Sequence, residues 1–170
     1  MKYEELLTEN PVMKHADAVS VKQVIADAER NYMGGFFCGE SVMAAIWKNF
    51  DLDLPPEAMK MTSMMGGGMG SGCVCGALNG GAVALSMFFG RTSPMDPDVR
   101  TCQRLTRELH DYFKAENGKN VTCCRILTRG FDSPIKRAEQ CQSFTGLCAG
   151  KTAEILIREL GMKNLDDEEA

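Results

Sequence analysis

Residues 70–81 read "GSGCVCGALNGG" and run directly into the apolar stretch "AVALSMFFG" at 82–90. The glycines before Cys73 favour an irregular loop, because glycine gains little from a regular helix and tolerates unusual backbone angles. From Gly76 onward, small and apolar residues continue without a breaker as far as Phe89. The stretch therefore predicts a loop that ends at Cys75 and a buried helix over 76–89.

Helical periodicity continues on both sides of this stretch, and the alternating runs typical of strands are too short to build a sheet. The sequence predicts an all-α fold, an irregular single-domain bundle of about six helices spanning residues 1–170, with frayed ends at 1–16 and 161–170. Besides 76–89, the expected helical segments are 16–32, 39–50, 53–65, 96–117, a short one at "CCRIL" and 136–160.

Several caps and buried faces are expected within these segments. Asp53, Asp96 and Thr122 are predicted N-caps, with Pro97 in the first turn after Asp96. The long C-terminal helix contains two glycines, at 146 and 150, where an interruption is expected. The predicted core stripe of the first helix is Val19, Gln23 or Val24, and Ala26 or Ala28. That of the second helix is Val42, Ala45, Ile46 and Phe50. Met59, Met61, Met64 and Met65 are expected to pack adaptably in the core.

Composition narrows the classes of partner. The formal net charge is -4, and Lys and Arg are interspersed with acids, which argues against binding to nucleic acid or to an anionic membrane. The longest apolar run, 82–89, is far shorter than the ~20 residues of a bilayer span, and the first residues lack the apolar core of a signal peptide. We therefore expect a soluble, cytoplasmic protein.

The chain contains eight cysteines, which is many for a cytoplasmic protein. Disulfides are rare in that compartment, so cysteine-rich chains there more often bind metal or carry out redox chemistry. Cys38, Cys75 and the pair Cys123 and Cys124 fall at predicted helix starts, where free amides and the helix dipole stabilise a thiolate. These positions are the candidate functional thiols, and only one of the adjacent pair is expected to point at a given site, because neighbouring side chains diverge by ~100° around a helix.

The remaining cysteines call for different interpretations. Cys141 and Cys148 are two turns apart on one helical face, so either side chain can face a shared site. Cys102 lies on the apolar stripe from Val99 to Tyr112 and is expected to fill core space. Cys73 and Cys75 form a Cys-x-Cys pair that one metal ion can bridge, although this spacing alone has little specificity.

Glycines within the predicted helix 76–89 add a further feature. Gly76, Gly80 and Ala84 form one row of small residues, and a glycine costs about 1 kcal/mol relative to alanine inside a helix. A close neighbour is therefore expected along this row, either another helix or a bound cofactor. The glycines at 66–72 lack the preceding strand and the following Gly-Lys-Ser/Thr of a nucleotide-binding P-loop, so neither that loop nor a bound nucleotide is expected.

With these residues in view, the sequence resembles a redox-active family named for its C_GCAxxG_C_C cysteine pattern. The matching landmarks run from about residue 17 to 160: "FFCGESVMAAI", "GGGMGSGCVCGALNGGAVALSMFFGR", "CCRIL" and "AEQCQSFTGLCAGKTAEIL". The resemblance implies that the family's four cysteines correspond to Cys38, Cys75, Cys124 and Cys141. Cys124 is chosen over Cys123 because it directly precedes "RIL".

The resemblance implies redox chemistry without naming a substrate. We expect four helix-end cysteines, Cys38, Cys75, Cys124 and Cys141, to converge on an iron-sulfur cluster used for electron transfer, with Gly76 and Gly80 beside it. The alternative is a thiol-disulfide protein that forms a reversible bond among the same cysteines, and a structural zinc site ranks third. Related domains occur with haem, but this chain has no Cys-x-x-Cys-His. The redox partner protein and the oligomeric state, including a homodimer, stay open.

Overall fold

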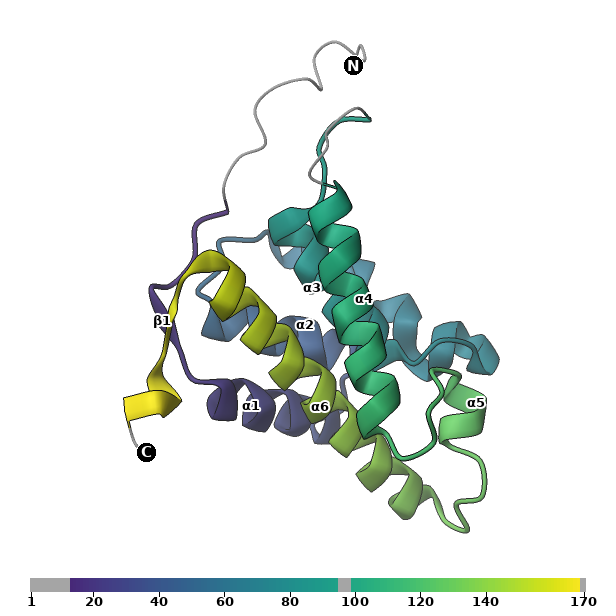
Figure 1. The fold of residues 1–170 in the computed structure, drawn as a ribbon. Helices are drawn as coiled ribbons and strands as arrows, with labels where there is room; N and C mark the ends of the chain where they lie inside the picture. Colours follow the sequence, from purple (N-terminus) through teal and green to yellow (C-terminus); the bar gives the residue numbers. More distant parts are fainter. Residues whose placement is uncertain (1–12, 95–98, 169–170) are drawn as a thin grey trace.

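The structure is a computed structural model that describes residues 13–94 and 99–168. Its six α-helices in these ranges are α1 (Val21–Met33), α2 (Cys38–Asn49), α3 (Gly76–Phe89), α4 (Val99–Glu116), α5 (Cys124–Leu127) and α6 (Pro134–Leu160). Figure 1 shows α6 crossing the molecule diagonally, and it packs against α1, α2, α3 and α4. The all-α prediction is confirmed.

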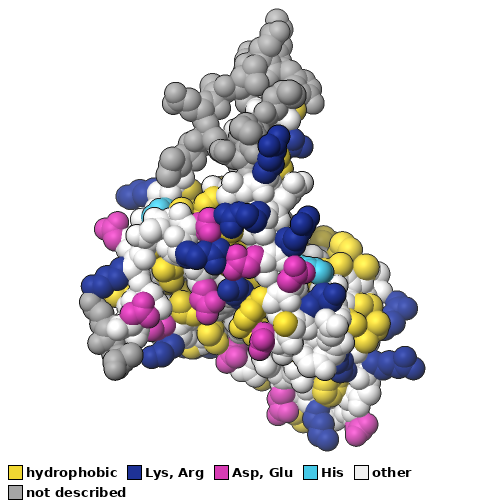
Figure 2. Space-filling model, in the orientation of Figure 1, with side chains coloured by type: hydrophobic (Ala, Val, Ile, Leu, Met, Phe, Trp, Pro, Cys, Tyr) yellow, Lys and Arg dark blue, Asp and Glu magenta, His cyan; other side chains and the backbone are white. Residues whose placement is uncertain are grey.

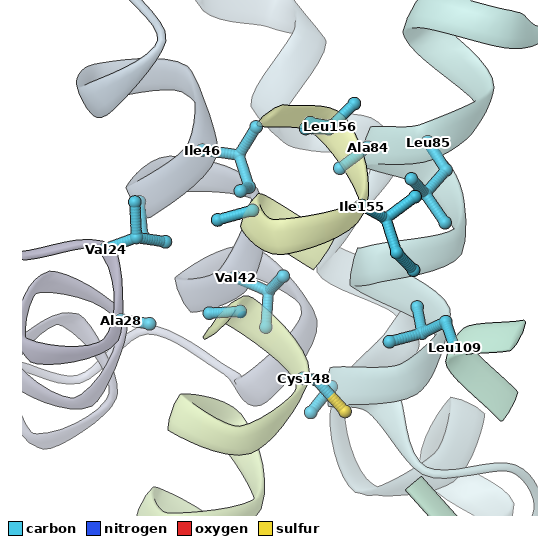
Figure 3. Close-up of a cluster of buried hydrophobic side chains, with 14 of the residues drawn as sticks. Val24, Ala28, Val42, Ile46, Ala84, Leu85, Leu109, Cys148, Ile155 and Leu156 are labelled. Carbon is cyan, nitrogen blue, oxygen red and sulfur yellow. The ribbon is translucent and has the colours of Figure 1, made fainter. Parts of the chain in front are cut away.

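The core forms where these helices face one another (Figure 3). Each helix contributes a stripe of side chains that are removed from solvent, as the 3.6-residue period requires. The predicted stripe of α2 is confirmed, because Val42, Ala45, Ile46 and Phe50 are all fully buried. Other central members are Val24, Ala28, Leu85, Leu109, Ile155 and Leu156.

Several helix boundaries follow from local chemistry. The Ser20 side chain accepts a hydrogen bond from the backbone of Gln23, so α1 begins at Val21, later than predicted, and Val19 lies in strand β1 (Ala18–Val19). Ser133 caps α6 in the same way, and Gly161 closes α6 in a left-handed conformation. Neither Gly146 nor Gly150 interrupts α6. Both lie against α1, at Glu29 and Ile25.

The C-terminal segment, where fraying of 161–170 is predicted, packs against the start of the chain's helical part as far as the structure describes it. Strand β2 (Lys163–Asn164) pairs in parallel with β1, and η5 (Leu165–Glu168) follows. Asp166 accepts hydrogen bonds from the Ser20 hydroxyl and the Lys22 amide, which holds this segment to the start of α1. Residues 1–12, 169 and 170 lie outside the described residues, as do the predicted cap Asp96 and Pro97.

The methionine-rich segment differs most from its prediction. It forms no α-helix but short turns, η2 (Pro56–Met61), η3 (Ser63–Met65) and η4 (Gly68–Gly72), and Asp53 does not cap them. Met61 and Met64 are 62% and 75% exposed, so their expected core role is wrong.

Figure 2 shows hydrophobic side chains gathered at the right-hand edge, while basic and acidic side chains are interspersed over the rest of the visible face.

Candidate functional site

One cavity of about 250 Å³ collects cysteines from four separate parts of the chain. Cys38 is the first residue of α2, Cys75 precedes α3, Cys124 opens α5, and Cys141 lies within α6. All four side chains line the cavity. The predicted convergence of these four cysteines is confirmed, although they are separated by up to about a hundred residues of sequence.

Backbone amides surround Cys38. The amides of Gly39, Gly67 and Ala77 lie close to its sulfur and favour the thiolate, which lowers the pKa. Burial outweighs them, and together with the nearby Cys141 it raises the pKa of the Cys38 thiol above its usual range. The amides come from α2, from the glycine-rich segment and from α3, so three elements meet at this one sulfur.

Cys75 is the most buried of the four cavity cysteines. Burial, with a smaller contribution from Cys38, raises the pKa of its thiol to about 12, against hydrogen bonds from the amides of Leu78 and Ala77. Its own amide donates to the Thr122 carbonyl oxygen at 2.8 Å, next to an antiparallel bridge between Val74 and Cys123. Thr122 therefore positions Cys75 rather than capping α5 as predicted. The residue at the N-cap of α5 is Cys123.

Cys124 and Cys141 lie near the charged side chain of Arg137. Burial raises the pKa of both thiols, the neighbouring Cys141 and Cys38 raise that of Cys124 further, and Arg137 opposes both shifts. The Tyr32 hydroxyl donates a hydrogen bond to the Cys141 sulfur, which also lowers the pKa of that thiol. Cys141 lies two turns inside α6, so the expectation that all four cysteines stand at helix ends is wrong for this residue.

The other four cysteines do not line the cavity. Cys73 is exposed, and Cys123 directs its sulfur to the Gly72 carbonyl oxygen at 3.3 Å. Cys102 is buried against Ser86, 3.3 Å from its hydroxyl, in agreement with a core role. Cys148 is fully buried beside Leu109 (Figure 3), where burial raises the pKa of its thiol strongly. Cys73 and Cys75 therefore do not share a site.

The predicted glycine row packs against α2. A Cβ at Gly80 would lie 2.5 Å from the Gly39 carbonyl oxygen, and one at Gly76 would lie 2.5 Å from the Cys38 sulfur. Neither glycine lines the cavity, so the contacts observed for the row are those of close helix packing. Gly76 still bears on the site, because only a residue without a side chain leaves room for Cys38 there.

Three cavity features were missed by sequence reasoning: the Tyr32 hydroxyl, the Arg137 guanidinium and the Gly67 amide. Arg137 precedes Cys141 by four residues, so helical spacing would have placed the two on one face. The sequence around Tyr32 contains nothing comparable, since its contact with Cys141 joins α1 to α6. The Gly67 contact depends on a left-handed backbone that periodicity does not describe.

The cysteines are arranged around a space. All eight are free thiols in the structure. Among residues 13–94 and 99–168, no group of three or more Cys, His, Asp or Glu side chains is placed to hold a single metal ion. A preformed mononuclear site, such as structural zinc, is therefore not found in the described part of the chain.

Comparison with protein families supports a redox role. Residues 36–155 match the family described as "Putative redox-active protein (C_GCAxxG_C_C)". The chain belongs to this family. The matched span contains all four cavity cysteines of this C_GCAxxG_C_C protein. Searches of curated proteins and of solved structures gave no match. Within the described ranges, no helix is long and apolar enough to cross a membrane.

Proposed function

We propose that this protein is an electron-transfer protein in which Cys38, Cys75, Cys124 and Cys141 hold an iron-sulfur cluster. The observation that carries the proposal is their placement: four thiols from four elements line one cavity of about 250 Å³. Four cysteine ligands are the usual set for such clusters. When bound, the cluster supplies reversible one-electron chemistry, and the protein supplies the ligands and their surroundings.

The donor groups around the cavity fit this group chemically. Amides of Gly39, Gly67, Ala77 and Leu78 donate to the sulfurs of Cys38 or Cys75, and the Tyr32 hydroxyl donates to Cys141. Hydrogen bonds to cluster sulfurs are a means by which proteins adjust reduction potential. Donors of this kind would also orient the ligands of a bound cluster.

Ionisation of the four thiols in this cavity requires a cation that compensates their charge. Burial raises the pKa of all four thiols, and for Cys38, Cys75 and Cys124 the other cysteines raise it further. Four thiolates alone would repel one another in this partly buried space. Metal coordination removes the thiol proton and compensates the negative charge, which relieves that repulsion.

The second candidate function is thiol-disulfide exchange among the same cysteines. It is favoured by one observation, the closeness of Cys38 to Cys75: the Cys38 sulfur lies against Gly76, the residue after Cys75, and raises the pKa of the Cys75 thiol. The raised pKa values act against it, because the thiolate is the attacking species and these thiols are largely protonated near pH 7. We therefore rank the cluster first.

Anaerobic purification followed by iron and acid-labile sulfide assays and a visible spectrum tests the proposal. The wild type is expected to contain both elements and to show charge-transfer absorption that bleaches on reduction. Cys75→Ser should lose them, whereas Cys73→Ser, two residues away but exposed, should retain them. Iron-free protein in which mass spectrometry finds a reversible Cys38–Cys75 disulfide would support the second candidate instead.

A further inference from the structure

A second hollow adjoins the cysteine cavity and is basic. It measures about 480 Å³ and shares Gly67, Cys124, Thr128 and Arg137 with the cavity. Its remaining lining comes from Gly70, Ser71, Gly72 and Arg125, so none of the described residues around it is acidic. Below, this hollow is called the arginine groove.

The two guanidinium groups of the groove come from different elements, Arg125 from α5 and Arg137 from α6. No described carboxylate forms an ion pair with either side chain, although the chain as a whole is acidic with a net charge of -4. Two unpaired guanidinium groups that face one hollow attract anions, and their planar donors suit carboxylate and phosphate oxygens.

The glycine-rich segment fixes one side of the groove. Arg125 Nη2 donates a hydrogen bond of 2.7 Å to the Ser71 carbonyl oxygen, which holds that guanidinium across the segment. A Cβ at Gly72 would lie 3.1 Å from Arg125 Nε, so the absence of a side chain there makes room for it. Gly67 and Gly70 also line the groove, and a Cβ at either one would meet nothing within 4 Å, so no atom blocks the space beside them.

From this arrangement we infer that the arginine groove binds a small anion, a phosphate- or carboxylate-bearing molecule, next to Cys124. The inference concerns binding only and does not depend on the cluster proposed above. It places an anionic small molecule at the wall that the groove shares with the cysteine cavity. A substrate or an effector of the redox site would therefore be recognised by its charge.

Isothermal titration calorimetry on the full chain at low ionic strength tests this inference, with inorganic phosphate and malonate as probes. We expect saturable binding of at least one probe, and the preferred probe identifies the ligand as phosphate- or carboxylate-bearing. Arg125→Gln and Arg137→Gln should each weaken binding at least about tenfold, as loss of a charge-assisted pair predicts. Arg137→Lys should fall between the wild type and Arg137→Gln.

Arg129→Gln is the matched control, because Arg129 is exposed just after α5 and does not line the groove. Its affinity should stay within about twofold of the wild type. Melting curves by circular dichroism verify that each variant is folded. The inference is overturned by absence of saturable binding to both probes, by unchanged affinity in both glutamine variants, or by an equal loss in Arg129→Gln. If the purified protein contains no iron and still binds a probe, the inferred anion site stands and the proposed cluster does not.

Discussion

The two halves of α6 carry the same kind of side chain into opposite environments. In the first half, Cys141 lines a cavity together with Arg137 and Phe144 and accepts a hydrogen bond from Tyr32. In the second half, Cys148 is fully buried within the apolar core. Two turns of helix separate them. The chemistry open to a cysteine is thus set by the groups that surround it, and one helix can supply both a reactive face and a structural one.

Alanine substitutions of Cys141 and Cys148 should give the largest difference between the two halves of α6. Cys141→Ala removes a proposed ligand, so iron and sulfide content should fall at least about tenfold while the fold persists. Cys148→Ala should keep the iron but lose about 1 kcal/mol of unfolding free energy, since it leaves a small gap in the core. Metal assays and urea unfolding of both variants check this. Equal iron loss in the two variants would show that both halves of α6 contribute to the site.

Two glycines of α3 extend the comparison to the neighbouring helix. Gly81→Ala would bring a Cβ within 2.6 Å of Thr152 Oγ1 and 2.7 Å of a Leu109 methyl, which should cost about 1–3 kcal/mol by overpacking. Gly76→Ala should cost a similar amount and also displace the Cys38 sulfur. We expect reduced iron content for Gly76→Ala only, measured beside thermal unfolding. If Gly81→Ala lost as much iron, the second half of α6, which Gly81 contacts at Thr152, would be part of the site.

Asp27 tests the stability of α1 and α2, two of the helices that pack against α6. This buried carboxylate accepts hydrogen bonds from Lys48 and Asn49, and these outweigh its burial and lower its pKa to about 2. A lowered pKa means that Asp27 contributes stability above its ordinary pKa of about 4 and that this contribution is lost as the pH falls toward 2. The contribution is about 2 kcal/mol.

The corresponding measurement is urea unfolding of wild type and Asp27→Asn between pH 7 and pH 3. The free-energy difference between the two proteins should be largest at neutral pH and shrink on acidification. Lys60→Gln, at an exposed position of η2, serves as the control for a change of one charge. A difference that stays constant with pH would contradict the assigned role of the ionised carboxylate.

Tyr32→Phe should have the smallest effect. It removes the hydrogen bond that lowers the pKa of Cys141, so in iron-free protein this thiol should react about two- to fivefold more slowly with iodoacetamide at pH 8. Peptide mass spectrometry follows the reaction, and exposed Cys73 in the same sample provides the reference rate. Faster alkylation of Cys141 would indicate that Tyr32 mainly shields the sulfur.

The sequence predicted those parts of the molecule that local rules control. Helix α3 has the predicted bounds, Gly76–Phe89, because the glycine-rich segment before it and Gly90 after it mark both of its ends. The burial of Phe50 and Cys102 follows equally from periodicity. The family resemblance named the four cysteines that meet in the cavity, which spacing alone did not, since only tertiary packing brings Cys141 to Cys38.

Prediction failed where backbone conformation overrides composition. The methionines before Gly66 have helix-like spacing, yet left-handed angles at Gly67, Gly68, Met69 and Gly70 do not continue a right-handed helix, and the segment stays at the surface. The same segment supplies the Gly67 amide to Cys38. Tyr32 was missed because its role arises from a contact between α1 and α6 that no local pattern records.

The adjacent pair Cys123 and Cys124 tests whether the cavity cysteines hold the cluster, because the two residues differ by one position and only Cys124 lines the cavity. The measurement is the iron and acid-labile sulfide content of Cys123→Ser and Cys124→Ser, purified anaerobically beside the wild type. We expect wild-type content in Cys123→Ser and little or none in Cys124→Ser, with both variants folded. Equal content in the two variants, or none in the wild type, would contradict this expectation.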